Sequence, residues 1–139
     1  MYDNTIAQKI AQQNKQKPLT NFASVKPNTP LKKLNLNWAE GDLPEHQRTK
    51  HVHRLHPYLG KFVPQLVEVF LRKYKPTLVY DPFVGSGTTL VESNALGIDS
   101  IGADISAFNV LLSKVKTDDY DIPVLEKEIY DILNRLSIH

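Results

Sequence analysis

A glycine-containing turn between two regular patterns constrains the fold of this chain more than any other feature. The run TLVY (77–80) consists of apolar, β-forming residues, which predicts a strand buried on both faces. The turn DPFVGSGTT (81–89) follows at once, and its two glycines, Gly85 and Gly87, allow positive φ and a close approach of the backbone to a ligand. A helix predicted over residues 88–96 would present its unpaired N–H groups to the same place. We therefore expect a binding loop at the carboxyl end of a buried strand.

The flanking patterns extend this turn to a βαβ unit. Apolar residues recur every four positions over residues 62–74, and Pro64 suits a first helical turn, so a helix is expected there. After the turn, Gly97 can end the second helix, SIGAD (100–104) predicts a second strand, and Ser106 can cap a third helix. A strand, a crossover helix and a second strand imply a parallel pair with helices on the sheet faces. The predicted fold class is α/β.

The ends of the two strands carry acidic residues that suit a nucleoside ligand. Asp104 follows Asp81 by 23 residues, and an acid at the end of the second strand can accept hydrogen bonds from both ribose hydroxyls. Asp81 can hold loop amides or an amine of the ligand. The turn lacks the lysine of a P-loop, the third glycine of a dinucleotide fingerprint and the G-x-S-x-G pattern that would make Ser86 a nucleophile. These absences disfavour ATP, a dinucleotide and an attacking serine.

Charge is distributed unevenly along the chain. Residues 1–56 carry nine Lys and Arg against four Asp and Glu, residues 57–80 carry four against one, and residues 81–139 carry four against ten. The basic front half also contains four histidines, so it is either an arm that lies near a polyanion or a solvated, partly flexible arm. The four histidines have neither the helical H-x-x-x-H spacing nor that of a zinc finger, so no metal site is expected.

Composition divides the chain into three parts and restricts its compartment. Residues 1–53 are predicted to be an extended, irregular basic arm, residues 54–117 an α/β part, and residues 118–139 an amphipathic helix. With no cysteine, the chain has neither a disulfide framework nor a Cys-based zinc site. No apolar run approaches a membrane span and the first residues do not resemble a signal peptide, so we expect a cytoplasmic protein.

Three segments in the expected order resemble one enzyme family. The stretch DPFVGSGTTLVE (81–92) resembles the cofactor-binding motif of the S-adenosylmethionine-dependent DNA amino-methyltransferases, which modify adenine-N6 or cytosine-N4. HPYLGKFVPQLV (56–67) resembles the segment that precedes this motif, and IGADISAFNVLLSKVKT (101–117) resembles the family's second strand, its ribose-binding acid and the next helix. The resemblance covers about residues 54–117. It implies a partial Rossmann-like methyltransferase domain with S-adenosylmethionine as cofactor and DNA as substrate.

The resemblance also assigns roles to individual residues. The turn would surround the methionine and sugar, Asp104 would bind the ribose, and Ile105 would lie against the adenine. Lys61, in the upstream segment, is a candidate partner for the methionine carboxylate. A solvated lysine and a helix-capping aspartate are the alternatives for Lys61 and Asp104. The residues assigned to the cofactor site are Tyr58, Lys61, Pro64, Asp81, Phe83, Gly85, Ser86, Gly87, Thr88, Asp104 and Ile105.

The chain departs from the family in its catalytic motif. Members of the family hold the target amine and the flipped base with [DNS]-P-P-[YFW], and this chain contains no Pro-Pro dipeptide. No catalytic residue is therefore assigned. We expect a split enzyme, in which this chain binds the cofactor and a second protein chain in a heterodimer carries the catalytic motif. The alternatives are a non-catalytic S-adenosylmethionine-binding or regulatory remnant and a fragment of an RNA methyltransferase.

The predicted C-terminal helix bears on this expectation. Its apolar residues alternate in steps of three and four, which is typical of a helix packed against a partner. Such a stripe covers either this chain's own sheet or a second polypeptide. The residues of the stripe are Ile122, Leu125, Ile129, Ile132 and Leu136.

Overall fold

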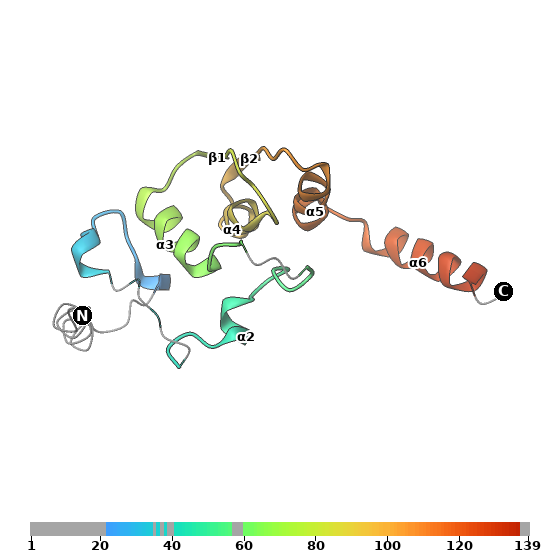
Figure 1. Cartoon of the computed structure of the whole chain (residues 1–139), viewed down its shortest axis with the longest axis horizontal. Helices are drawn as coiled ribbons and strands as arrows, with labels where there is room; N and C mark the ends of the chain where they lie inside the picture. Colours follow the sequence, from blue (N-terminus) through green and yellow to red (C-terminus); the bar gives the residue numbers. More distant parts are fainter. Residues whose placement is uncertain (1–21, 35, 37, 39–40, 57–59, 137–139) are drawn as a thin grey trace, which may run out of the picture.

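The computed structural model describes residues 22–34, 36, 38, 41–56 and 60–136, and its sheet is a pair of parallel strands (Figure 1). Strand β1 (Leu78–Asp81) pairs with β2 (Asp99–Gly102). Helix α4 (Thr88–Ala95) connects the two strands, so the predicted βαβ unit and the mixed α/β class are confirmed. The other elements are η1 (Phe22–Ser24), η2 (Leu31–Lys33), α2 (Glu45–Arg48), α3 (Pro64–Tyr74), α5 (Ala107–Thr117) and α6 (Ile122–Leu136).

Local sequence signals determine where these helices begin and end. Pro64 occupies the first turn of α3, where its missing N–H costs no hydrogen bond. Gly97 follows α4 with a φ of 67°, and the side chain of Ser106 caps α5 by accepting a hydrogen bond from the Asn109 N–H at 3.4 Å. The three predicted helices are confirmed. The second strand ends at Gly102, so Asp104 lies two residues beyond it rather than within it.

Among the described residues, helices cover only one face of the small sheet. Helix α4 packs on the face to which Gly102 belongs, where an added Cβ would lie 2.6 Å from Val84 Cγ2 and 3.1 Å from Leu90 Cδ1. On the opposite face Leu78, Tyr80 and Ile101 are exposed, Tyr80 by 63%. The expectation of a strand buried on both faces is therefore wrong for this structure. The reason is that α3 and α5 pack beside α4 instead of crossing the other face.

The segment that precedes α3 is docked and not extended. Val25 and Leu43 are buried, as are Val69 and Leu71 of α3, and His53 is completely buried. The prediction of an extended arm is thus wrong for the part of residues 1–53 that the structure describes, because Val25, Leu43 and His53 are buried in it. Residues 1–21 lie outside the described residues, and the division of the chain at residue 53 stays a prediction.

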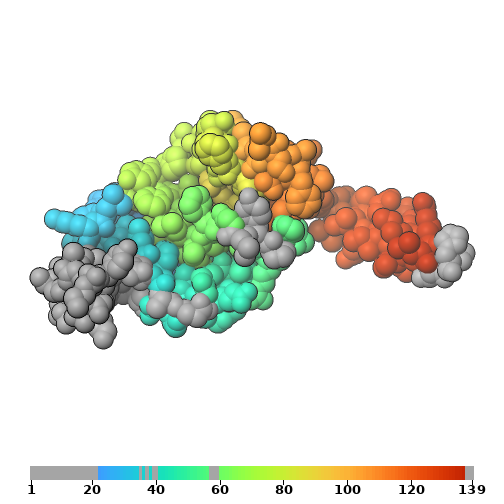
Figure 2. Space-filling model, viewed as in Figure 1, coloured from blue at the N-terminus to red at the C-terminus, as the bar shows by residue number. Residues whose placement is uncertain are grey.

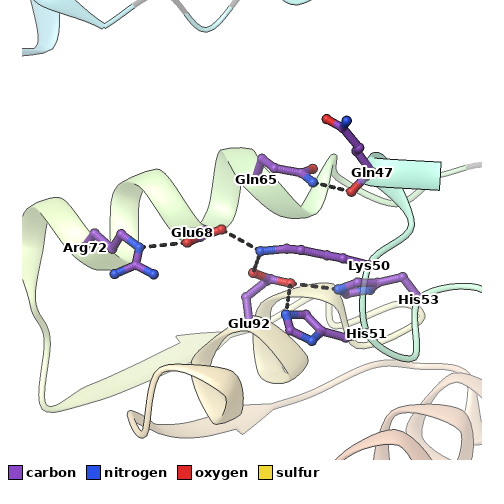
Figure 3. A network of polar contacts seen from close by, with 8 residues as sticks. All are labelled: Gln47, Lys50, His51, His53, Gln65, Glu68, Arg72 and Glu92. Carbon is purple, nitrogen blue, oxygen red and sulfur yellow. Dashed lines mark hydrogen bonds and ion pairs between the residues drawn. The ribbon is translucent and has the colours of Figure 1, made fainter. Parts of the chain in front are cut away.

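Buried charges hold this segment against α3 and α4 (Figure 3). The Lys50 Nζ donates to Glu68 Oε2 at 2.5 Å and lies 2.7 Å from Glu92 Oε2, while the Arg72 Nε donates to Glu68 Oε1 at 2.7 Å. Burial alone would lower the pKa of Lys50, but the two carboxylates outweigh it and raise this pKa above its usual range. Lys50 therefore stays charged and cross-links the two helices.

The ion pairs of Glu68 predict a pH-dependent stability. Burial alone would raise the pKa of Glu68, but Lys50 and Arg72 hold it below the ordinary value of 4.5. Because a lowered carboxyl pKa stabilises the folded state only while the group is ionised, this contribution is complete above pH 4.5 and is lost as the pH falls through the lowered pKa. We expect Glu68→Gln to lower Tm by roughly 2–5 °C at neutral pH, and the deficit to shrink in acid.

Thermal melts followed by circular dichroism at neutral and acid pH would measure this difference. Glu126→Gln is the matched control, because Glu126 is exposed on α6. A deficit for Glu68→Gln that stayed the same in acid would contradict the assignment of the effect to the ionised carboxylate.

Helix α6 projects from the rest of the molecule (Figures 1 and 2). The predicted stripe is present on it, and none of the helix's residues is buried. The alternative in which this helix covers the chain's own sheet is therefore wrong for this structure. Within the described part of the chain, no helix has the length and apolar character needed to cross a membrane.

Candidate functional site

A cavity of about 780 Å³ lies at the carboxyl ends of both strands. Parallel strands place their carboxyl ends at one edge, and ligands of open α/β sheets bind there. Eight of the residues assigned from the sequence line the cavity, whereas Pro64 and Gly87 do not, and Tyr58 lies outside the described residues. The eight are Lys61, Asp81, Phe83, Gly85, Ser86, Thr88, Asp104 and Ile105. Residues that the sequence reasoning did not assign also line it: Gly60, Phe62, Pro82, Val84, Thr89, Ala103, Ser106 and Asn109.

The glycine turn has the backbone geometry that its sequence predicts. Gly85 has a φ of 50° and Gly87 a φ of 83°, both in the left-handed region that favours glycine. The Phe83 N–H donates to Asp81 Oδ1 at 3.1 Å, so Asp81 holds a loop amide as expected. The Val84 N–H donates to the Ala103 carbonyl at 2.9 Å, which continues the pairing of the strands into the loop. The turn is thus fixed to both strand ends.

Asp104 connects the turn to the start of α5. Its Oδ2 accepts from the Gly85 N–H at 2.9 Å, and its Oδ1 accepts from the Ser106 N–H at 2.8 Å and from the Asn109 side-chain amide at 3.1 Å. The N–H groups of Ser106 and Gly85 lower the pKa of the Asp104 carboxyl, so it is ionised at neutral pH. A carboxylate has about four acceptor positions, and these contacts leave one on Oδ2. Asp104 therefore organises the loop and can still accept a hydrogen bond from a ligand.

Apolar side chains flank the mouth of the cavity. Phe83 is 86% exposed and Ile105 is fully exposed, although both are large and apolar. Both line the cavity and can pack against a flat apolar group such as a nucleobase. The Ser86 Oγ is buried and has no hydrogen-bond partner among the described residues. An adenosine-type ligand has polar groups that can pair with the Ser86 Oγ and a flat base that can pack against Phe83 and Ile105. The lining of the cavity therefore fits such a molecule.

Two residues of α5 support the turn, and the sequence reasoning missed both. The Ser113 Oγ donates to the Gly85 carbonyl at 3.0 Å, and the Lys116 Nζ donates to the Ser86 carbonyl at 2.8 Å. Burial lowers the pKa of Lys116, and the positive charge of Lys61 lowers it further. Ser113 lies four positions after Asn109, and Lys116 lies three positions after Ser113, so all three share one face of α5. This spacing is the sequence signal that could have identified Ser113 and Lys116.

Lys61 reaches the cavity from the segment that precedes α3. Its Nζ donates to the His53 carbonyl at 3.0 Å, and Lys61 lines the cavity together with its neighbours Gly60 and Phe62. The His56 ring packs edge-on against Phe108 of α5, with 5.4 Å between the ring centroids. The upstream segment therefore closes one side of the site.

These features define an α/β unit with a ligand site at the carboxyl ends of two parallel strands. A model of the N6/N4 methyltransferase family, described as a DNA methylase, matches residues 2–114. The chain therefore belongs to the DNA amino-methyltransferase family, whose members use S-adenosylmethionine as the methyl donor. No solved structure matches the chain.

Curated relatives of the chain are type II methyltransferases. M.MjaII of Methanocaldococcus jannaschii is 52% identical over 105 residues, which cover 74% of this chain and 20% of the relative. M.MvaI of Kocuria varians is 39% identical over 85 residues, which cover 58% of this chain and 19% of the relative. M.BsoBI of Geobacillus stearothermophilus is 32% identical over 93 residues, which cover 61% of this chain and 18% of the relative. The chain thus spans about a fifth of the length of these relatives.

Proposed function

We propose that this chain supplies the S-adenosylmethionine-binding part of a DNA amino-methyltransferase. The observation that carries the proposal is the cavity at the strand ends, in which the carboxylate of Asp104 is hydrogen-bonded to the Gly85 N–H of the glycine turn. Membership of the family and the type II methyltransferase relatives support the same reading. The Rossmann-like class of the complete domain is part of the proposal.

Each wall of the cavity would hold a different part of the cofactor. The free acceptor position of Asp104 would accept from the ribose, and the exposed Phe83 and Ile105 would enclose the adenine. The turn around Gly85 would face the sugar and methionine, and the Lys61 ammonium would attract the methionine carboxylate. When bound, S-adenosylmethionine supplies the methyl group that goes to an exocyclic amine of adenine or cytosine.

The catalytic motif would come from a separate polypeptide. The 139 residues contain no Pro-Pro dipeptide, so the proposal places the [DNS]-P-P-[YFW] motif elsewhere. The exposed apolar residues on the open face of the sheet, Leu78, Tyr80 and Ile101, support a partner, because a buried strand pair is the stable form of such a unit. The partner would also supply most of the recognition of DNA.

Binding and transfer assays test the proposal separately. We expect the purified chain to bind S-adenosylmethionine in equilibrium dialysis and to transfer no methyl group to duplex DNA alone. Adding a polypeptide that carries the [DNS]-P-P-[YFW] motif should produce methylated adenine or cytosine. Binding with no transfer in any combination would support a non-catalytic module, methylation of RNA alone would support the RNA alternative, and absence of binding would refute the proposal.

A further inference from the structure

A buried carboxylate outside the cavity is linked to one of its walls. Glu92 lies on α4 and is only 1% exposed. Its Oε1 accepts from the His53 Nε2 at 2.9 Å, its Oε2 lies 2.7 Å from the Lys50 Nζ, and the His51 ring is 4.0 Å away (Figure 3). All three partners come from the segment that precedes α3. Glu92 is therefore the point at which this segment is attached to α4.

Buried charges of this kind specify a geometry more than they add stability. Removing two charges from water is costly, and well-packed apolar residues would often stabilise a fold equally well. Here the charges are balanced, because the carboxylates of Glu68 and Glu92 face the cations of Lys50 and Arg72. A balanced network with short contacts allows one arrangement of the segment and disfavours others.

The fixed arrangement continues into the cavity through His53. The ring of His53 donates to Glu92, and the carbonyl of the same residue accepts from the Lys61 Nζ at 3.0 Å. Through these two hydrogen bonds, His53 links Glu92, a buried side chain of α4, to Lys61 in the cavity wall. Lys61 needs such support, because its charge and that of Lys116 repel each other.

We propose that Glu92 is a positioning residue that acts through His53 on Lys61 and so sets the affinity of the site for the anionic methionine end of the cofactor. This inference rests on the proposed function. Glu92 lines no part of the cavity, whereas Thr88, at the start of the same helix, does. Its effect would thus be selective for ligands that carry the carboxylate.

Two ligands and two matched variants test this selectivity. S-adenosylmethionine contains the methionine carboxylate, and 5′-methylthioadenosine keeps the nucleoside but lacks that group. Glu92→Gln should weaken binding of S-adenosylmethionine about tenfold, since residues that orient a ligand-binding group typically contribute about 10- to 100-fold, and should leave 5′-methylthioadenosine nearly unaffected. Glu68→Gln is the control, because Glu68 also pairs with Lys50 but does not contact His53. It should leave both affinities nearly unchanged.

The variant Lys61→Met tests the cavity end of this link on its own, whether or not Glu92→Gln folds. It should show the same selective loss, and Glu92→Gln added to it should have no further effect on S-adenosylmethionine binding. Equal losses for both ligands, or no loss in Glu92→Gln, would overturn the inference while leaving the proposed function intact. If the unmodified chain bound neither ligand, the proposed function would fail instead. Isothermal titration calorimetry measures all of these affinities, with thermal melts reporting folding.

Discussion

Replacing Gly87 by alanine is expected to lower the free energy of unfolding by roughly 2–5 kcal/mol and Tm by about 10 °C or more. Gly87 has a φ of 83°, and an alanine in this left-handed conformation costs about 1–2 kcal/mol. The added Cβ would also lie 3.0 Å from Ser113 Oγ and 3.1 Å from Ser113 Cα, and overpacking of this kind costs about 1–3 kcal/mol. Because one of these neighbours is helix backbone, α5 would have to move away from the turn. Chemical denaturation monitored by circular dichroism would measure the loss.

Gly97→Ala is the matched control for the backbone cost. Gly97 has a φ of 67°, but an added Cβ there would meet nothing within 4 Å. We expect this variant to lose only the conformational cost of about 1–2 kcal/mol. The difference between the two variants would then measure the contact between the turn and α5. Equal losses would show that α5 does not pack tightly against the turn.

The parts of the fold that the sequence predicts correctly are those with local causes. Pro64 starts α3, Ser106 caps α5 and Gly97 follows α4, and each residue acts within one helical turn of itself. The alternation of short apolar runs with helical patterns likewise indicates a parallel strand pair. Local signals of this type predict the structure correctly, because they can be interpreted without knowing which distant residues are in contact.

The docking of the segment that precedes α3 could not be predicted, because its ion pairs and hydrogen bonds to α3 and α4 join residues that are distant in sequence. His53 and Glu92 are 39 positions apart, and glutamate is a residue type that usually faces solvent. A charged residue in an amphipathic helix is normally assigned to the exposed side, so Glu92 gives no sign of its burial. The sequence therefore predicts an extended arm, whereas His53 is completely buried in the structure.

In the site, sequence reasoning identified the residues of the turn but not those behind it. The glycine spacing and the acid at the second strand are visible in the sequence, and both lie at the cavity. Ser113 and Lys116 bond backbone carbonyls of the turn, and only their spacing from Asn109 along one helix face marks them in the sequence. Lysine rarely lies buried, yet Lys116 is buried and holds the Ser86 carbonyl.

Removal of the Asp104 carboxylate is expected to have the largest effect on cofactor binding. In Asp104→Ala the Gly85 N–H and the Ser106 N–H lose their acceptor, and the proposed contact with the ribose disappears. Hydrogen bonds to a charged group contribute more than neutral ones, so we expect affinity for S-adenosylmethionine to fall by roughly 100-fold or more. Asp99→Asn is the matched control, because Asp99 is the first residue of β2, five positions before Asp104, and is exposed.

A second pair of ligands separates direct recognition of the ribose from a disordered turn. The unmodified chain should bind adenosine more tightly than 2′,3′-dideoxyadenosine, because only adenosine offers hydroxyl donors to the free acceptor position of Asp104. In Asp104→Ala both ligands should bind weakly and equally, since the acceptor is gone. If the variant kept its preference for adenosine, the ribose would be recognised by another group, and Asp104 would act on binding only by holding Gly85 and Ser106 in place. If Asp104→Ala kept its preference for adenosine and its Tm was unchanged, Asp104 would have no role in the site.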